Sequence, residues 1–498
     1  MSSPLLLGID EGTTAVKAAL FDLDLRELAR ARRAVPVRHP GSGLVEQDPE
    51  AILEAVLDAV AEVLGAAEGR EVIAAGLDHQ GESVLAWEAG SGRPLTPVIV
   101  WQDKRSEELL ASIDERASER SGLPLDPYFS AGKLAWMLAH EQRVEAARAA
   151  GSLRMGTLDA FISERLGAGF ETDLSTASRM QLLAVGGQDW DAELLELFGL
   201  RRDWLARIAP TVGELGELSS VRWPAPLRLA ARLVDQQAAL AGSGAVRAGE
   251  LKATYGTGVF VLGRTAAPVR AQGLLPTVAW ARSSAASGDD SGSEPARLEV
   301  AHALDGGVFA AGALLDWLAQ GLGLAPDAPA LAARAAEVPD SSGVMVLPAI
   351  SGLGAPWWEP RARGVLAGLH PGVRPPHIAR AALEAIAWRV ADVVEAIARE
   401  APVISLRVDG GLTNDPTLVQ LQADALEVPV EVGRPDTTVL GAAMLAGVGA
   451  GVFADVEDAA QRLAPGRAVA ARTDPRERAG ARERWRAFVR SSYSIVTS

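Results

Sequence analysis

The sequence predicts an α/β protein built from two related halves. Short apolar runs alternate with stretches of helical periodicity along the chain, which is the pattern of sheets layered with helices. A short strand that leads into a turn of glycine and threonine occurs at residues 10–14 and again at residues 254–260. The chain has 498 residues, enough for two substantial domains. We place the boundary between the halves at residues 241–247.

In the first half, apolar runs at residues 5–10 and 15–21 flank a polar turn, which predicts a β-hairpin with a functional tip. Asp48 is a candidate N-cap and Pro49 a candidate first residue of a helix, because apolar residues then recur at helical spacing. Further strands are expected at residues 72–77 and 98–101. Each ends in polar residues, as strands at the edge of a cleft commonly do.

The second half repeats this pattern. Residues 251–254 and 259–262 predict a second hairpin, with Gly256-Thr257-Gly258 at its tip. A strand at residues 406–408 leads into two glycines, after which Asn414 or Asp415 caps a helix that begins at Pro416. Glycines at both hairpin tips let backbone N–H groups approach a polyphosphate without obstruction. The repeated tips, each with an aspartate nearby, therefore predict a phosphate-handling enzyme.

Charge and composition exclude several other classes. The formal net charge is −16, and no run of lysine and arginine with interleaved aromatic residues is present to overcome it, so the chain would repel a nucleic acid. The absence of cysteine rules out disulfides and fits a cytoplasmic location. The start of the chain does not read as a signal peptide. The longest uncharged stretch, residues 437–454, is expected to be a tightly packed buried helix with its following turn, so no membrane contact is predicted.

A collinear set of motifs that spans nearly the whole chain resembles the FGGY carbohydrate kinases, most closely the glycerol kinases. The resemblance implies two actin-like (ribonuclease H-like) domains that face an interdomain cleft. Residues 1–243 would bind the acceptor and hold the phosphate hairpin and the catalytic aspartate, and residues 244–498 would bind the nucleotide. The motifs are Asp10-Glu11-Gly12-Thr13-Thr14, Val100-Trp101-Gln102, Asp126-Pro127-Tyr128-Phe129-Ser130, Gly156-Thr157-Leu158-Asp159, Thr176-Ala177-Ser178-Arg179, Asp235-Gln236-Gln237, Tyr255-Gly256-Thr257-Gly258, Ser351-Gly352-Leu353-Gly354 and Asp409-Gly410-Gly411.

The resemblance assigns the reaction chemistry to a few residues. Asp235 would be the base that takes the hydroxyl proton; alternatively it only caps the helix that follows. Asp10 would position Mg²⁺, through water, or it is a turn-forming residue. Thr13, Thr14 and Lys17 would contact phosphate, although a lysine near a hairpin is usually a solvated charge.

The remaining site residues bind the two substrates in this scheme. Thr257 would face the γ-phosphate, or Gly-Thr-Gly only makes a tight turn. The nucleotide's base and ribose would contact Gly312, Gly411 and Asn414, unless the glycines serve helix packing. The acceptor pocket would consist of Glu82, Trp101, Tyr128, Asp235, Gln236 and Phe260, because carboxylates and amides bind hydroxyls while aromatic faces cover carbon.

One departure from the family pattern concerns the acceptor. Glycerol kinases have Asn-Gln-Arg-Glu where this chain has His79-Gln80-Gly81-Glu82, and losing the guanidinium removes donors and opens volume. We therefore expect an ATP- and Mg²⁺-dependent kinase of a small polyol, glycerol kinase-like, with a tetritol, pentitol, xylulose or ribulose as alternative acceptors. A non-catalytic actin-like ATP-binding module is the other alternative. A homo-oligomer is compatible with the sequence.

Overall fold

The computed structural model describes residues 3–283 and 298–496. Its contacts divide the chain into two compact units, each built from separate stretches of sequence. The first change of unit follows Val246, and two later stretches return to unit 1. Unit 1 consists of Met1–Val246, Pro276–Ala303 and Asp436–Ala464; unit 2 consists of Arg247–Leu275, Leu304–Pro435 and Pro465–Ser498.

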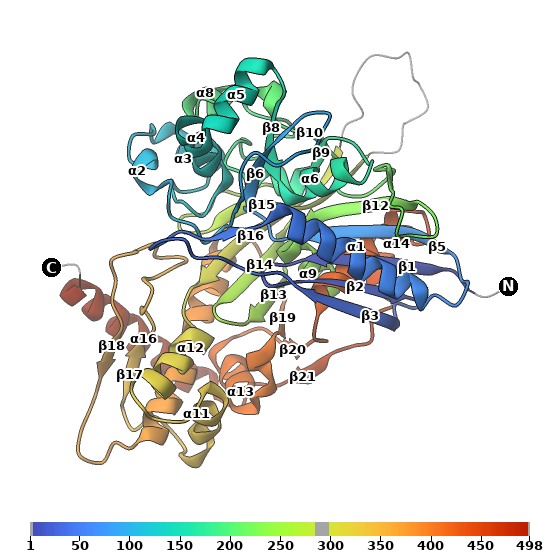
Figure 1. Cartoon of the computed structure of the whole chain (residues 1–498). Coiled ribbons are helices and arrows are strands. Elements are labelled where there is room, and N and C mark those ends of the chain that lie inside the picture. The colour runs from blue at the N-terminus through green and yellow to red at the C-terminus, as the bar shows by residue number, and fades with distance from the viewer. Residues whose placement is uncertain (1–2, 284–297, 497–498) are drawn as a thin grey trace. The chain divides into compact units, whose positions relative to one another are not determined.

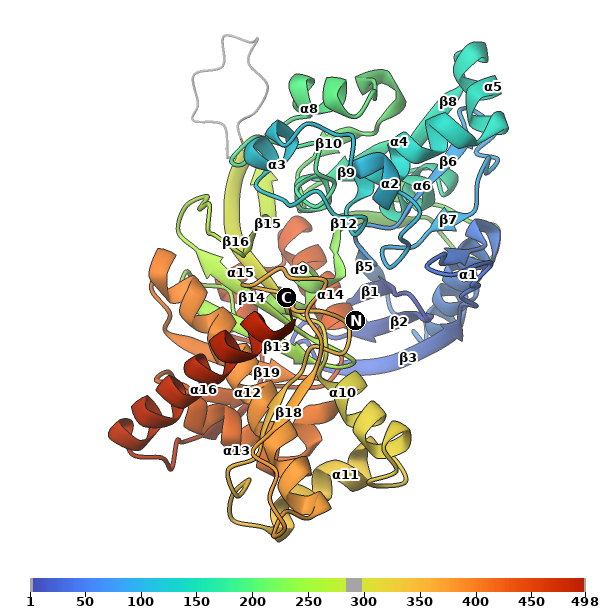
Figure 2. The same cartoon turned by 90° about the vertical axis from the view of Figure 1, so that its left-hand side faces the viewer.

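The main sheet of unit 1 has the strand order β11-β12-β5-β1-β2-β3 (Figures 1 and 2). β1 (Leu5–Glu11) and β2 (Ala15–Phe21) form the predicted antiparallel hairpin. β1 also pairs in parallel with β5 (Val72–His79), which pairs in parallel with β12 (Leu227–Val234). The other elements around this sheet are β3 (Glu27–Ala34), β11 (Glu217–Leu218), α1 (Pro49–Gly65), α9 (Asp235–Gly242), α14 (Thr437–Gly449) and α15 (Val456–Ala460).

Helices cover both faces of β1. Leu5, Leu7 and Ile9 share a core cluster with α1, whereas Gly8, which points to the opposite face, lies against α14. Helix α1 begins as predicted. Its first residue is Pro49, and the side chain of the N-cap residue Asp48 accepts a hydrogen bond from the backbone N–H of Glu50, the second residue of the helix. Two covered faces explain why β1 reads as a continuous apolar run.

Glycines allow α14 to pack directly on the backbone of its neighbours. A Cβ atom at Gly76 of β5 would lie 2.0 Å from the carbonyl oxygen of Ala442, and one at Gly441 would lie 1.8 Å from that of Ala238 in α9. Such distances leave no room for a side chain. The predicted buried helix is thus confirmed, and no helix within residues 3–283 and 298–496 is long and apolar enough to cross a membrane.

Unit 1 contains a second sheet with the strand order β4-β7-β6-β8. Its core joins β6 and β8 to α4, and it holds the segments that carry Glu82, Trp101 and Tyr128. The elements of this part of unit 1 are β4 (Glu46–Gln47), β6 (Val84–Glu88), β7 (Val98–Ile99), β8 (Leu153–Thr157), α2 (Glu107–Leu110), α3 (Arg116–Ser121), α4 (Ser130–His140), α5 (Gln142–Ala150), α6 (Leu158–Arg165), β9 (Glu171–Asp173), α7 (Leu174–Ala177), α8 (Ala192–Leu197), η1 (Arg202–Trp204) and β10 (Arg207–Ala209).

Unit 2 is organised around the second predicted hairpin. β13 (Glu250–Tyr255) and β14 (Val259–Thr265) pair antiparallel, and β13 pairs in parallel with β19 (Ser405–Asp409). The sheet order is β15-β16-β14-β13-β19-β20-β21, and β15 and β16 each pass from one unit to the other along their length. The other elements are β15 (Leu275–Ser283), β16 (Leu298–Val308), α10 (Gly312–Asp316), η2 (Trp317–Gly321), α11 (Ala328–Arg334), η3 (Ala335–Glu337), β17 (Met345–Leu347), β18 (Val365–Ala367), α12 (Pro375–Glu400), η4 (Gly411–Asn414), α13 (Pro416–Ala425), β20 (Val430–Val432), β21 (Arg467–Val469) and α16 (Pro475–Val496).

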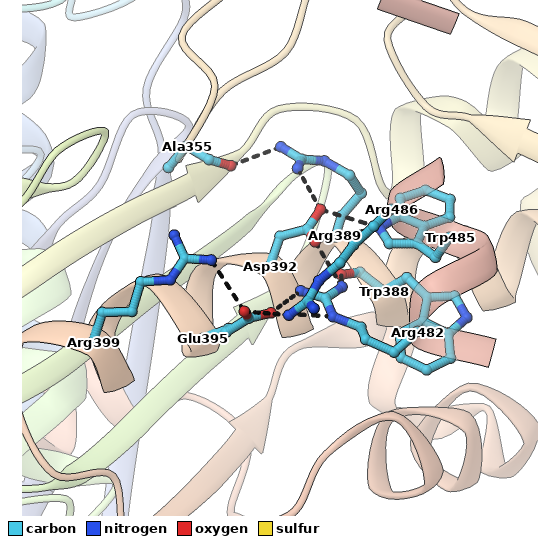
Figure 3. Close-up of polar contacts among 9 residues, drawn as sticks. All are labelled: Ala355, Trp388, Arg389, Asp392, Glu395, Arg399, Arg482, Trp485 and Arg486. Atoms are coloured by element: carbon cyan, nitrogen blue, oxygen red, sulfur yellow. Dashed lines mark hydrogen bonds and ion pairs between the residues drawn. The ribbon is translucent and has the colours of Figure 1, made fainter. Parts of the chain in front are cut away.

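A network of charged side chains joins α12 to α16 (Figure 3). Asp392 accepts from Arg389 at 2.8 Å and pairs with Arg482 at 2.6 Å. Glu395 pairs with Arg399 at 3.0 Å, with Arg482 at 2.5 Å and with Arg486. Burial alone would raise the pKa of Glu395, but hydrogen bonds from the surrounding arginines outweigh it and hold the pKa at about 2.

The low pKa predicts an acid-sensitive contact between α12 and α16. A carboxyl group whose pKa is lowered on folding stabilises the protein above its ordinary pKa of 4.5, and this contribution is lost as the pH falls towards about 2. Because Glu395 is partly exposed, we expect Glu395→Gln to cost only about 1–2 kcal/mol at pH 7. Urea denaturation at several pH values measures this cost, which should shrink between pH 4.5 and pH 2.

A matched control is available on the same helix. Among the described residues, Glu384 pairs only with Arg380, at 2.8 Å and at i,i+4 spacing, so Glu384→Gln should cost at most about 0.5 kcal/mol. Equal costs for the two substitutions would show that the arginine cluster around Glu395 adds no stability.

Candidate active site

The tip of the first hairpin lies beside the carboxyl end of β1. Gly12 N–H donates to the Ala15 carbonyl oxygen at 3.1 Å, which closes the turn. Thr13 is half-buried, its hydroxyl accepts from Trp101 Nε1 at 3.0 Å, and its carbonyl oxygen accepts from Gln47 Nε2 at 2.8 Å. Thr14 is exposed. The turn is therefore held by side chains from the second sheet of unit 1, and it presents Thr14 outward.

Carboxyl groups gather at the ends of three adjacent parallel strands. Asp10 in β1 lies opposite Asp78 in β5, and Asp235 begins α9 directly after β12. Burial raises the pKa values of Glu11 and Asp78 well above their ordinary values, and the charges of Asp10 and Asp235 raise both further. The carboxyl groups of Glu11 and Asp78 therefore favour their neutral forms beside the two charged aspartates.

Asp235 is the first residue of α9 and is half-buried. Its Oδ1 accepts from the backbone N–H of Gln236 at 2.6 Å. The N-cap position belongs to Val234, which makes no side-chain capping bond. This geometry does not match the capping role considered for Asp235 from the sequence, in which the side chain would bond two or three residues ahead.

Lys17 is tied to two carboxylates. Its Nζ lies 3.2 Å from Asp10 Oδ2 and 3.2 Å from Asp436 Oδ1, and Asp436 also pairs with Arg30 at 2.7 Å. Burial would lower the pKa of Lys17, but the charges of Asp10 and Asp436 raise it. Lys17 is thus not the freely solvated charge that the sequence left open, and its link to Asp436 was not predicted.

Three of the expected acceptor residues of unit 1, Glu82, Trp101 and Tyr128, lie in one aromatic and polar cluster. The rings of Trp101 and Tyr128 lie edge to face with centroids 5.7 Å apart. Glu82 is buried, and its Oε1 accepts from Arg179 Nε at 2.7 Å. Lys133 donates to the backbone carbonyl oxygen of Tyr128 at 2.6 Å, and burial lowers the pKa of this lysine to about 7. Sequence reasoning did not single out Arg179 or Lys133 as site residues.

The predicted nucleotide residues of unit 2 lie on the tip of the second hairpin and near it. Gly312 N–H donates to the Gly256 carbonyl oxygen at 3.1 Å, and the carbonyl oxygen of Thr257 accepts from Ala311 N–H at 3.0 Å. A Cβ at Gly312 would lie 2.7 Å from the Gly256 carbonyl oxygen, so only glycine fits. The structure thereby brings Thr257 and Gly312 together. Phe260 is half-buried in the adjoining β14.

Gly411 and Asn414 are the first and last residues of the short helix η4, which follows β19. β19 is the neighbour of β13, and Asp409 accepts from the Thr254 hydroxyl at 2.6 Å. The cap of the following helix is Asp415 rather than Asn414, because the Asp415 side chain accepts from two backbone N–H groups of α13. Asn414 is therefore not needed as the cap of α13.

The carboxylates described at this site do not form a ready-made metal cage. Within the described part of the chain, no group of three or more His, Asp and Glu side chains has the arrangement that could hold a metal ion. Mg²⁺ is often held by one or two carboxylates together with water and substrate phosphates. The assignment of Asp10 to Mg²⁺ therefore stays a prediction.

Both halves of the chain match known proteins. Residues 5–242 match the N-terminal domain, and residues 251–450 the C-terminal domain, of the FGGY family of carbohydrate kinases. Glycerol kinase of Citrifermentans bemidjiense is 41% identical over 469 residues, 92% of each chain. Glycerol kinase of Gloeobacter violaceus is 42% identical over 470 residues, 91% of this chain and 90% of that one.

Solved structures agree with this result. Plasmodium falciparum glycerol kinase with ADP superposes with a TM-score of 0.89 at 25% identity, covering 98% of each chain. Gluconate kinase from Lactobacillus acidophilus has a TM-score of 0.87 at 20% identity, covering 100% of this chain and 99% of that one, and shows the shared fold. The predicted α/β class with two actin-like (ribonuclease H-like) domains is confirmed, whereas the interdomain cleft stays a prediction.

Proposed function

Because the chain belongs to the FGGY family of carbohydrate kinases, we propose that it transfers the γ-phosphoryl group of ATP to a hydroxyl of a small polyol, with glycerol as the first candidate. The observation that carries the proposal is the position of Asp10 and Asp235 at the carboxyl ends of β1 and β12, the two strands that flank β5, with the Gly-Thr-Thr tip directly after β1. Two relatives that are glycerol kinases, 41% and 42% identical, support this acceptor class.

Asp235 is the proposed general base. It would take the proton of the acceptor hydroxyl as that oxygen forms its bond to the γ-phosphorus and the bond between the γ-phosphorus and the β–γ bridging oxygen breaks, so that ADP leaves. Its bond from Gln236 N–H fixes one carboxylate oxygen, and the second oxygen is the one we assign to the proton. Because the carboxyl group of Asp78 favours its neutral form, it adds little electrostatic repulsion against the carboxylate of Asp235.

The phosphates of ATP are proposed to bind at the first hairpin tip. The backbone N–H groups and hydroxyls of Thr13 and Thr14 are suited to phosphate oxygens, and Lys17 supplies a positive charge. In unit 2 we assign Thr257 to the γ-phosphate, and Gly312, Gly411 and Asn414 to the base and ribose. The contacts of Gly312 with the hairpin tip support this grouping.

The residues at the first tip fit a Mg²⁺ ion that keeps most of its waters. Asp10 is a carboxylate that is only 5% exposed, its Oδ2 lies 3.2 Å from Lys17 Nζ, and it stands at the end of β1 directly before the turn that carries Thr13 and Thr14. We propose that Asp10 holds Mg²⁺ through water. When bound, Mg²⁺ neutralises charge on the β- and γ-phosphates.

A longer acceptor is the second candidate, and Gly81 favours it. The backbone of Gly81 has φ +65°, and a Cβ there would meet one atom within 4 Å, Val234 Cγ1 at 3.2 Å. The side-chain donors that glycerol kinases place at this position are absent, because glycine has no side chain. Tetritols, pentitols, xylulose and ribulose therefore remain acceptors to be tested beside glycerol.

An ADP-coupled assay tests the function directly. We expect at least one of glycerol, erythritol, threitol, xylitol, ribulose, xylulose and gluconate to stimulate ADP release well above the acceptor-independent rate. No stimulation by any of them would favour the non-catalytic ATP-binding module over the kinase. A cytoplasmic location and a homo-oligomeric state belong to this proposal; the lack of cysteine supports the first.

A further inference from the structure

We infer that Arg179 is a positioning residue of the acceptor site, where it orients the carboxylate of Glu82 and, together with Gly81, decides which acceptors bind. The inference rests on the proposed function, because that function places Glu82 against the acceptor. Its support comes from four features of unit 1. These are the glycine at position 81, the contact between Arg179 and Glu82, the aromatic rings beside that contact, and the hydrogen bonds that hold the turn carrying Arg179.

Position 81 contributes no side chain next to Glu82. Its backbone lies in the left-handed region, which side-chain-bearing residues seldom adopt. Any guanidinium that orients Glu82 must therefore come from another part of the chain. Gly81 is buried, and a Cβ there would lie 3.2 Å from Val234 Cγ1, so a side chain at this position would require Val234 to shift.

Arg179 meets this requirement. Its Nε donates to Glu82 Oε1 at 2.7 Å, and the two side chains are only 4% and 5% exposed. The Arg179 guanidinium carbon also lies 5.8 Å from the ring centroid of Tyr128 and 5.9 Å from that of Phe129. A directional, charge-assisted bond to one carboxylate oxygen fixes the plane of the carboxylate. We assign the second oxygen, Oε2, to an acceptor hydroxyl.

The turn that carries Arg179 is itself held in place. Asp173 caps α7 by accepting from two of its backbone N–H groups, and Thr211 donates to Asp173 at 2.7 Å. Thr176 in α7 is 2.9 Å from His79 Nε2, and its carbonyl oxygen accepts from Arg179 N–H at 2.9 Å. Because His79 belongs to β5, the same strand end carries both Glu82 and the anchor of Arg179. Such support is what a preorganised binding site requires.

The chemistry of this arrangement specifies an acceptor class. A carboxylate with one fixed oxygen binds one hydroxyl strongly, and the aromatic edges of Trp101 and Tyr128 cover a carbon chain. Because Gly81 brings no side-chain donor to the acceptor, the donors that an acceptor meets here are those around Glu82. A linear polyol or ketose with at least four carbons is therefore the acceptor class that we compare with glycerol.

Steady-state kinetics of Arg179→Gln and Arg179→Lys test the inference on the full chain. With the best acceptor of the wild-type enzyme, Arg179→Gln should raise the acceptor KM by about 10–100-fold, the range for losing a hydrogen bond to a charged group. The KM for ATP and the acceptor-independent ATPase rate should stay within about twofold. Arg179→Lys keeps the charge but loses the planar guanidinium, so its acceptor KM should lie between the acceptor KM of the wild type and that of Arg179→Gln.

A double variant tests whether Arg179 acts through Glu82. In the Glu82→Gln background, Arg179→Gln should raise the acceptor KM by less than about threefold, because the carboxylate to be oriented is gone. Full additivity of the two substitutions would overturn the inference. The matched control is Arg389→Gln, which removes another buried arginine paired with a carboxylate, at 2.8 Å in unit 2. It should lower the thermal midpoint and leave the acceptor KM unchanged.

The possible failures can be told apart. A wild-type enzyme that phosphorylates none of the acceptors contradicts the proposed function itself. An active wild-type enzyme whose Arg179→Gln variant has an unchanged acceptor KM, or loses affinity equally for acceptor and ATP, overturns only the role of Arg179. Should Arg179→Gln be insoluble, Arg179→Lys decides the question, because a wild-type acceptor KM in that variant also overturns it.

Discussion

Replacing Asp235 with Asn is expected to lower kcat by about 10²–10⁴-fold, the usual range for the loss of a general base. The amide has nearly the same shape as the carboxylate and can still accept from Gln236 N–H, so α9 should begin as in the wild type. It cannot take the hydroxyl proton. The expected signature is a fall in kcat with little change in the affinity for ATP, measured by steady-state kinetics and by nucleotide binding at equilibrium.

The proper control for Asp235→Asn lies in the same carboxyl cluster. Glu11 is buried, and the pKa of its carboxyl group is raised by that burial, so it already favours the neutral form. Glu11→Gln therefore changes little charge and should lower kcat by less than about tenfold. If Asp235→Asn turned over at a near-normal rate, Asp235 would be removed from the mechanism. If both variants lost activity equally, the loss would reflect disruption of the carboxyl cluster, and Asp235 would not be identified as the general base.

Gly441→Ala is expected to destabilise unit 1 by about 3 kcal/mol or more. Helix propensity alone would favour alanine by about 1 kcal/mol. The contact with α9 reverses that sign, because the added Cβ would lie 1.8 Å from the carbonyl oxygen of Ala238, a fixed backbone atom. The helices would have to separate, which costs packing along α14. Thermal or urea denaturation measures the loss, and poor soluble yield would be its first sign.

Gly480→Ala supplies the comparison. Gly480 also lies within a helix, α16, but a Cβ there would have one neighbour within 4 Å among the described residues, Arg484 Nη1, at an ordinary 3.6 Å. This substitution should stabilise the protein by about 0.5–1 kcal/mol. Destabilisation of similar size by both substitutions would mean that the close approach between α14 and α9 does not set the cost.

Local signals in the sequence were sufficient to predict the hairpins and the first helix cap. The Gly-Thr-Thr and Gly-Thr-Gly turns and the Asp48 cap depend on residues that are neighbours in the chain, and the structure confirms these elements. The site features that were missed depend on long-range pairing. Asp436 reaches Lys17 across 419 positions, and Arg179 reaches Glu82 across 97. Neither the periodicity of apolar residues nor the spacing of motifs in the sequence indicates such contacts.

The neutral carboxyl group of Asp78 was missed for a related reason. The sequence indicated a strand that ends in an acid, but the charge state depends on burial and on the charges of Asp10 and Asp235, which only the sheet order brings close. The discontinuous make-up of the two units was missed as well. Residues 276–303 and 436–464 return to unit 1 without any compositional change at their ends that would announce it.

The position of α14 in the chain has a consequence for biosynthesis. This helix covers one face of β1 and β5, yet it follows β1 by more than 400 residues. While the ribosome is still translating the middle of the chain, α14 has not been synthesised, so the apolar face of the sheet that it later covers is exposed to solvent. The backbone around the glycines that contact α14 is exposed as well. Unit 1 can therefore reach its native state only late in translation, and until then its uncovered apolar surface is prone to aggregation.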